Sequence, residues 1–352
     1  RYFAKHFGVR SKIFWLPDTF GYSSQIPQII RLAGSEYFYT QKLSWNNINK
    51  FPHTTFRWIG LDGSSVLTHM SPAETYTASV SIDDLVDSVK KHKDVAYSNE
   101  SLYLYGHGDG GGGPREDMLE RLQYVGDVDG LPRVKHAHPN EFYEHVDRTA
   151  RDLVTWKGEL YFELHRGTYT SQANTKKNNR QAEFLLRDVE MLSVLAQSFS
   201  HGFAYPAAEL ERIWKLVCLN QFHDVIPGSS IEMVYKDVDV IYADVIGSAM
   251  KMKEGAVAAL FSHVAAQSID SASGMLFVNT TAWPRTDVVA VQGLRGSNGS
   301  QQTRVRDGAG LVVAAAVPGC SVAVVDTSSG ADAAENAAVV PVGVFKDGKG
   351  SI

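Results

Sequence analysis

Residues 11–30, SKIFWLPDTFGYSSQIPQII, place a carboxylate just after a predicted strand. Residues 11–16 are mostly apolar and predict a short strand. Pro17 ends that strand, because proline has no N–H to donate to a sheet. Asp18 follows in a turn, at the end of a strand where α/β enzymes usually carry their reacting groups. Position alone also allows Asp18 simply to hydrogen-bond its own turn.

The rest of the first half alternates strand-like and helix-like segments, which implies a mostly parallel sheet. After Asp18 a helix is predicted over residues 25–32, with Ser23 or Ser24 as its N-cap. The further predicted strands are 36–40, a hairpin of 54–59 and 65–69, 102–105 and 132–136. The further predicted helices are 82–92, 114–124 and 141–149.

In the second half the predicted secondary structure changes first to helices and then to strands. The whole chain is therefore predicted to be a multidomain protein with an α/β, an α and a β part. Amphipathic patterns predict helices over residues 178–198, 207–222 and 233–261, and three helices of similar length indicate a bundle. From residue 274 the chain is rich in strands and turns and resembles the beginning of a β-sandwich. The predicted domains are an α/β domain over 1–158, a helical domain over 159–263 and a β-rich domain over 264–352.

Composition describes an ordinary soluble globular protein. Of its 352 residues 44% are hydrophobic and 21% charged, and the net charge of −5 gives no reason to expect nucleic acid or a membrane surface as a partner. No apolar run approaches the roughly 20 residues that span a bilayer. Cys218 and Cys320 lack CxxC spacing, which favours a reducing compartment. The chain begins at Arg1 without a methionine, so we expect a piece of a longer protein.

A glycine-rich loop, YGHGDGGGG over residues 105–113, follows a predicted strand and precedes a helix. It contains G-x-G-x-x-G, but Asp109 inside the loop would oppose a pyrophosphate, and the next strand offers no acid for a ribose. A merely flexible loop is the simple alternative. The preferred interpretation is that the glycines let the backbone approach a bulky ligand while Asp109 projects toward it. Asp18 and Asp109 would then be the paired carboxylates that glycoside hydrolysis needs.

Two further segments carry candidate ligand-binding groups. His223 and Asp224 follow a predicted helix, where a histidine often only complements the helix dipole, although the adjacent acid favours a metal or sugar site. These two residues cannot complete a zinc shell. His165 and Arg166, in ELHRG, suit either a sugar site or an internally satisfied hinge.

Several long segments resemble the α-mannosidases of glycoside hydrolase family 38, most of all their cytosolic and vacuolar branch. They are FWLPDTFGYSSQIPQI (14–29), the stretch from TQKLSWNNINKFPH to THMSPAE (40–74), YGHGDGGGGP (105–114), ELYFELHRGTYTSQANTKKNNR (159–180), LNQFHDVIPGSSI (219–231) and FVNTTAWPR (277–285). The resemblance implies part of a seven-stranded type of α/β barrel-like catalytic domain, a helical bundle and a β-rich region.

The resemblance also implies roles. Asp18 would be the nucleophile of a retaining reaction and a ligand of a divalent ion, Zn²⁺ or another such as Co²⁺. His223 would be a second ligand of that ion, and Asp224 would hold sugar hydroxyls. Phe20 would line the sugar pocket, and Asp109 would be the general acid/base.

His165 and Arg166 would lie near the cleft, without an assigned role. The substrate would be terminal α-linked mannose of oligosaccharides, the compartment the cytoplasm or vacuole, and a homo-oligomer is compatible with the resemblance. The two remaining metal ligands of the family, from a His-x-Asp motif on its first strand, are expected upstream of Arg1, so the isolated chain is predicted to be inactive. A non-catalytic sugar-binding or scaffold relative is the main alternative.

Overall fold

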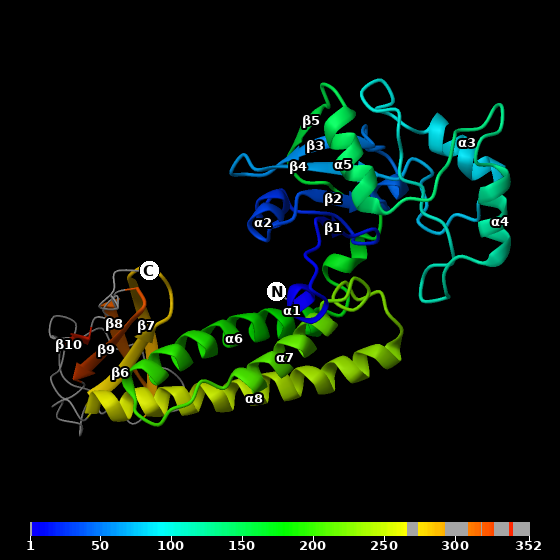
Figure 1. Cartoon of the computed structure of the whole chain (residues 1–352). Coiled ribbons are helices and arrows are strands. Elements are labelled where there is room, and N and C mark those ends of the chain that lie inside the picture. The colour runs from blue at the N-terminus through cyan, green and yellow to red at the C-terminus, as the bar shows by residue number, and fades with distance from the viewer. Residues whose placement is uncertain (1, 266–273, 293–308, 318, 327–337, 341–352) are drawn as a thin grey trace. The chain divides into compact units, whose positions relative to one another are not determined.

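The structure, a computed structural model, describes residues 2–265, 274–292, 309–317, 319–326 and 338–340 (Figure 1). The chain folds as two compact units, Arg1–Ser171 and Gln172–Ile352.

A five-stranded sheet organises the first unit. Its strands lie in the order β1 (Ile13–Trp15), β2 (Tyr37–Thr40), β4 (Ser65–Met70), β3 (Thr55–Ile59) and β5 (Thr155–Lys157). β1, β2 and β4 are parallel, β3 is antiparallel to β4, and β5 is parallel to β3. The prediction of a mostly parallel sheet that contains one hairpin is confirmed.

Helices cover both faces of this sheet. Successive side chains of a strand point to opposite faces, so neighbouring residues of β2 contact different helices. Phe38 of β2 packs in one core with Ile30 of α2. Its neighbours Tyr37 and Tyr39 pack in another core with Tyr143 of α5. The helices of this unit are α1 (Tyr2–Phe7), α2 (Ile26–Leu32), α3 (Ile82–Lys90), α4 (Glu116–Tyr124) and α5 (Pro139–Thr149), with 3-10 turns η1 (Lys42–Trp45) and η2 (Arg166–Tyr169).

Some local predictions are wrong. Residues 102–105 form no regular strand, only a single bridge between Tyr105 and Ala78. The side chains of His69 in β4 and of Ser71 just after it take the backbone hydrogen bonds of Leu102 that a neighbouring strand would have made. Residues 132–136 pair with no strand among the described residues, and they are too exposed to bury the face that a strand needs.

The expected serine cap of α2 is also absent. Gln25 is the N-cap residue, and no side chain caps the helix. Ser23 Oγ accepts only a long hydrogen bond, of 3.4 Å, from the N–H of Gln25. Pro27 lies in the first turn, where a missing N–H costs nothing, so the helix starts without a serine cap.

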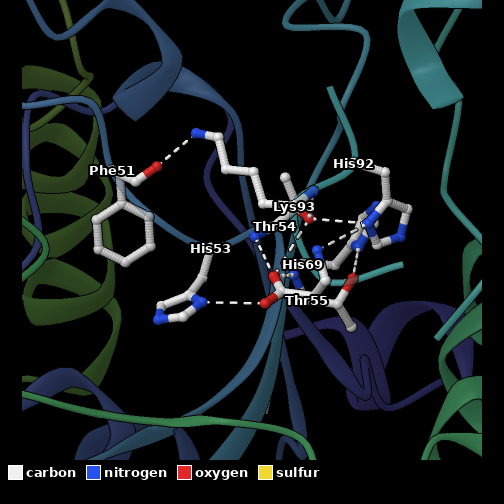
Figure 2. Close-up of polar contacts among 8 residues, drawn as sticks. Phe51, His53, Thr54, Thr55, His69, His92 and Lys93 are labelled. Carbon is white, nitrogen blue, oxygen red and sulfur yellow. Dashed lines mark hydrogen bonds and ion pairs between the residues drawn. The ribbon is translucent and has the colours of Figure 1, made fainter. Parts of the chain in front are cut away.

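A buried polar network lies beneath the β3–β4 hairpin (Figure 2). Asp94, which is 2% exposed, accepts the backbone N–H groups of Thr54 and Thr55. The hydroxyl of Thr55 contacts Nδ1 of His69 at 2.9 Å. Nε2 of His69 accepts the N–H of Leu102 at 3.1 Å, which requires a neutral ring with its hydrogen on Nδ1. Burial, with a smaller effect of the nearby His92, holds the pKa of His69 well below its usual value.

The helices of the second unit share one core and are α6 (Ala173–Phe199), α7 (Ala207–Asn220) and α8 (Glu232–Ala265). Leu186, Ile213 and Tyr242, one from each helix, are fully buried in it. The three predicted helices are therefore confirmed with small shifts of their ends. Among the described residues, no helix combines the length and apolar character needed to cross a membrane.

The described strands of this unit pair antiparallel. One sheet contains β10 (Ala338–Val340), β9 (Ser321–Asp326) and β6 (Gly274–Asn279), and the other contains β7 (Arg285–Gln292) and β8 (Ala309–Val317). Part of the predicted β-rich domain, including residues 341–352, lies outside the described residues. The β-sandwich and the bundle of the sequence prediction stay predictions.

Acid should weaken the first unit through His69. Its depressed pKa keeps the folded ring neutral, whereas the unfolded ring takes up a proton below about pH 6.5. This contribution to stability is therefore complete above about pH 6.5 and is lost as the pH falls toward the folded-state pKa, by up to about 1.4 kcal/mol per pH unit.

The measurement is the urea midpoint at which β3 and β4 lose protection from hydrogen exchange, taken at several pH values from neutral to mildly acidic. His69→Gln in the full-length protein should flatten this dependence, and the exposed His201→Gln is the matched control. An equal slope in the wild type and in His69→Gln would contradict the assignment.

Candidate active site

Asp18 lies just beyond β1, beside the end of β2. The carbonyl of Pro17 accepts the N–H of Lys42 at 3.1 Å, which ties the turn to the residues that follow β2. The hydroxyl of the buried Tyr22 donates to the carbonyl of Leu16 at 2.8 Å and holds the turn from the core side. Asp18 thus sits at the carboxyl edge of the parallel strands.

A buried lysine that sequence reasoning missed pairs with Asp18. Nζ of Lys42 contacts Oδ1 of Asp18, and it lies 3.9 Å from the centre of the Trp45 ring and 5.4 Å from that of Phe20. An ammonium over aromatic faces is stabilised by the ring electrons. The signal that could have revealed Lys42 is its place two residues after an aromatic-rich strand, as Asp18 stands two residues after the predicted strand 11–16.

One tyrosine hydroxyl joins the two acids predicted from sequence. Tyr76, in the segment after β4, contacts Oδ2 of Asp18 at 2.9 Å and Oδ1 of Asp109 at 3.3 Å. Burial raises the pKa of Tyr76, and the hydrogen bond to Asp18 and the charge of that acid raise it further. Tyr76 therefore stays a neutral hydroxyl between the two carboxyl groups. Sequence reasoning missed this residue as well.

The glycine loop brings Asp109 to this hydroxyl. A Cβ at Gly106, whose φ is +110°, would lie 2.7 Å from the backbone nitrogen of Pro114. The N–H of His107 donates to the carbonyl of Gly113 at 3.0 Å and closes the loop on itself. Asp109 itself has φ of +54° and is exposed. Gly106 therefore serves close backbone packing and not only flexibility.

Aromatic rings line the neighbourhood of Asp18. His165 lies edge-on to Phe20, with ring centres 4.8 Å apart, and edge-on to Phe162 at 5.1 Å. Trp45, which is 45% exposed, meets His165 at 6.3 Å. Of the residues predicted for sugar binding, Phe20 and His165 are therefore in contact with each other and with the surroundings of Asp18.

Arg166 is more peripheral, and a buried acid beside it organises the segment. The Arg166 guanidinium is about half exposed and lies 4.0 Å from Glu163. Glu163 accepts the N–H groups of Ile48 and Asn49 and a side-chain hydrogen bond of 2.7 Å from Asn49. These hydrogen bonds lower the pKa of Glu163, and the bond from the backbone N–H of Asn49 has the largest effect. They fix the segment after Trp45 to the one that carries His165.

His223 and Asp224 belong to the second unit, in the turn after α7. Nε2 of His223 lies 3.6 Å from Oδ2 of Asp224. Ser229 Oγ donates to Oδ1 of Asp224 at 2.7 Å, and Ser230 Oγ donates to its carbonyl at 2.7 Å. The turn thus presents an adjacent imidazole and carboxylate. Because Asp18 belongs to the other unit, its convergence with His223 stays a prediction.

Comparison with known proteins identifies the two parts of the chain. Residues 1–159 match the glycosyl hydrolases family 38 N-terminal domain, and residues 163–260 match the alpha mannosidase middle domain. The chain belongs to glycosyl hydrolase family 38. The resemblance inferred from the motifs is confirmed.

Three relatives illustrate the extent of this family 38 match. Alpha-mannosidase 2C1 of Mus musculus is 46% identical over 82% of the chain and 27% of its own length. Alpha-mannosidase G of Dictyostelium discoideum is 51% identical over 70% of the chain and 22% of its own length. An alpha-mannosidase of Saccharomyces cerevisiae is 51% identical over 67% of the chain and 23% of its own length. The chain thus spans about a quarter of these relatives.

Solved structures agree on the fold. The crystal structure of an alpha-mannosidase from Enterococcus faecalis V583 superimposes with a TM-score of 0.68 and 17% identity, over 91% of this chain and 43% of that one. At this identity the likeness speaks for the fold alone.

The glycine loop gives a test with a built-in control. Gly106→Ala should open the loop, because its Cβ meets Pro114 and its φ is positive, at a local cost of about 1–3 kcal/mol. Gly113→Ala is the control, since nothing lies within 4 Å of a Cβ there. Hydrogen exchange of residues 105–114 in the full-length protein measures the difference. Equal protection in both variants would refute this account of the loop.

Proposed function

We propose that this chain carries catalytic machinery of a retaining exo-α-mannosidase that releases terminal α-linked mannose from oligosaccharides. The observation that carries the proposal is the shared contact of Asp18 and Asp109 with the Tyr76 hydroxyl. Two carboxyl groups that flank the scissile bond are the minimum equipment for glycoside hydrolysis. The relatives named α-mannosidase point to mannose as the sugar.

The shared contact with Tyr76 limits the distance between one oxygen of each acid. The oxygens that contact Tyr76 lie 2.9 Å and 3.3 Å from it, so they cannot be farther apart than these distances laid end to end. Retaining enzymes separate their carboxyl groups by about 5–5.5 Å, whereas inverting enzymes need about 6.5–9.5 Å to admit a water. The shared contact with Tyr76 is thus compatible with the direct attack by one acid that the family resemblance implies.

Asp18 is proposed as the nucleophile and Asp109 as the general acid/base. Lys42 and Tyr76 orient the Asp18 carboxylate toward the anomeric carbon. The Tyr76 hydroxyl has one hydrogen, which it donates to Asp18. In the proposed mechanism Asp109 carries its own proton and donates it to Tyr76 or to the glycosidic oxygen. Asp109 then removes a proton from the water that releases mannose from Asp18.

The proposed sugar contacts come from both units. Phe20 and His165 form an aromatic wall beside Asp18 in the first unit, and Arg166 stands at its periphery. Asp224 in the second unit offers a carboxylate, held by Ser229, for sugar hydroxyls. The alternative is a relative that binds mannose without cleaving it. Such a protein would keep the same sugar contacts, and in it the ion pair with Lys42 would hold Asp18 as a structural carboxylate.

A divalent ion, Zn²⁺ or another such as Co²⁺, is part of the proposal. The carboxylate of Asp18 and the imidazole of His223 are donor types that suit zinc. Such an ion would hold and polarise sugar hydroxyls as the ring distorts toward the transition state. Two ligands do not complete a zinc shell, and the isolated chain is accordingly proposed to be inactive.

Other parts of the proposal rest on the sequence patterns and on the family resemblance. They are the domain division at 158/159 and 263/264, the seven-stranded barrel, the helical bundle, the β-sandwich, a cytoplasmic or vacuolar location and a homo-oligomer.

Substituting each acid in the full-length protein tests the catalytic roles. Asp18→Asn should abolish turnover of every mannoside, since the attacking oxygen is lost. Asp109→Asn should slow substrates with poor leaving groups by about 100-fold or more and activated aryl mannosides much less, because only the former need protonation. Steady-state rates across a series of aryl leaving groups measure this, with the exposed Asp127→Asn as control.

Near-normal turnover by Asp18→Asn would overturn the assignment. A wild-type protein that binds mannose but turns over no mannoside would favour the non-catalytic alternative.

Metal binding is tested independently of activity. His223→Ala in the full-length protein should reduce the zinc retained after equilibrium dialysis, because an imidazole ligand is removed. His201→Ala, which changes an exposed histidine of the same unit, should retain wild-type zinc content. Equal zinc in both variants would remove His223 from the metal site.

A further inference from the structure

The segment that leads to Asp109 begins at Leu102, whose backbone is held by the side chains of His69 in β4 and of Ser71 just after it. Nε2 of His69 accepts the N–H of Leu102 at 3.1 Å, and Ser71 Oγ donates to the carbonyl of Leu102 at 2.9 Å. His69 is fully buried and Ser71 is 2% exposed. Both backbone groups of Leu102, its N–H and its carbonyl, are therefore hydrogen-bonded, although no strand forms there.

Beyond Leu102 the segment runs beside the residues that follow β4. The N–H of Ala78 donates to the carbonyl of Leu104 at 3.2 Å, and its own carbonyl accepts the N–H of Gly106 at 3.0 Å. Two residues before Ala78 is Tyr76, which contacts both acids. The offset between these two segments therefore decides whether Asp109 reaches the hydroxyl of Tyr76.

The His69 contact has a fixed chemistry. A backbone N–H can only donate, so Nε2 of His69 must be an acceptor and Nδ1 must carry the hydrogen. That hydrogen is directed to the Thr55 hydroxyl at 2.9 Å (Figure 2). The carboxylate of Asp94 in turn holds the N–H of Thr55 at 2.9 Å. The acceptor offered to Leu102 is thus fixed in tautomer and direction by the hairpin below it.

We propose that His69 is a positioning residue for the catalytic acid. Together with Ser71 it sets Leu102, and through the 102–106 segment it sets where Asp109 stands relative to Tyr76. This inference rests on the proposed function, in which Asp109 is the general acid/base. None of the atoms of His69 needs to touch substrate, because its action passes through the backbone.

A pair of amide substitutions separates the two contacts of the ring. Glutamine places its amide near the position of Nε2 and can still accept the N–H of Leu102, whereas asparagine reaches only the position of Nδ1 and leaves that N–H without its acceptor. Both variants remove the titratable ring and are similar in polarity. Ser71→Ala removes the second contact to Leu102 and keeps His69.

The assay is kcat/KM of the full-length protein with aryl mannosides of graded leaving-group acidity, with Asp109→Asn as reference. His69→Asn should lose about tenfold or more on poor leaving groups and little on activated ones, because a displaced acid forfeits part of its catalysis. His69→Gln should rescue most of that loss, and Ser71→Ala should show a smaller loss of the same kind.

The outcomes are distinguishable. If Asp109→Asn depends on the leaving group while His69→Asn and Ser71→Ala lose activity equally on all substrates, or lose none, the positioning role is wrong. If His69→Asn does not fold, Ser71→Ala alone decides in the same way. A flat leaving-group response of Asp109→Asn would instead overturn the proposed function, and with it the acid that His69 is proposed to place.

Discussion

Buried side chains satisfy the backbone of the irregular segments that leave the strand ends, and the first unit depends on this constraint. An amide that is removed from water without a partner is costly, so each such group needs an acceptor. Asp94 supplies it beneath the hairpin, Glu163 supplies it after η1, and His69 supplies it to Leu102. These acceptors, rather than regular pairing, determine how the loops above the sheet are arranged.

The same constraint, that a group removed from water needs a polar partner, applies to the carboxylate of Asp18. A buried ammonium contacts one oxygen of its carboxylate and a neutral phenol contacts the other, so the charge is compensated without bulk water. Aromatic faces around Lys42 restrict where that ammonium can move. Polar groups fixed in place before a substrate arrives need not reorganise during a reaction. Such an arrangement suits a carboxylate that must point in one direction.

Sequence predicted what depends on neighbouring residues and missed what depends on distant ones. The strand, proline and turn around Asp18 are local, and the glycines around Asp109 indicate a close backbone approach, so the sequence singles out both acids as candidates. Lys42 and Tyr76 meet Asp18 only because parallel strands end at a common edge. The apolar residues 102–105 predicted a strand, but the backbone of Leu102 is bonded to side chains, which periodicity does not reveal. The relation of His223 to Asp18 joins two units and stays a prediction.

The glycine loop combines positions that admit no side chain with positions that do. Added atoms at Gly106 or Gly108 would collide with Pro114 or Thr77, whereas a Cβ at Gly113 meets nothing within 4 Å. Residue 113 also lacks the positive φ of its neighbour Gly112. Side chains can therefore be introduced at residue 113 while the packing at Gly106 and Gly108 is kept, which makes residue 113 the natural position at which to vary the surface of this loop.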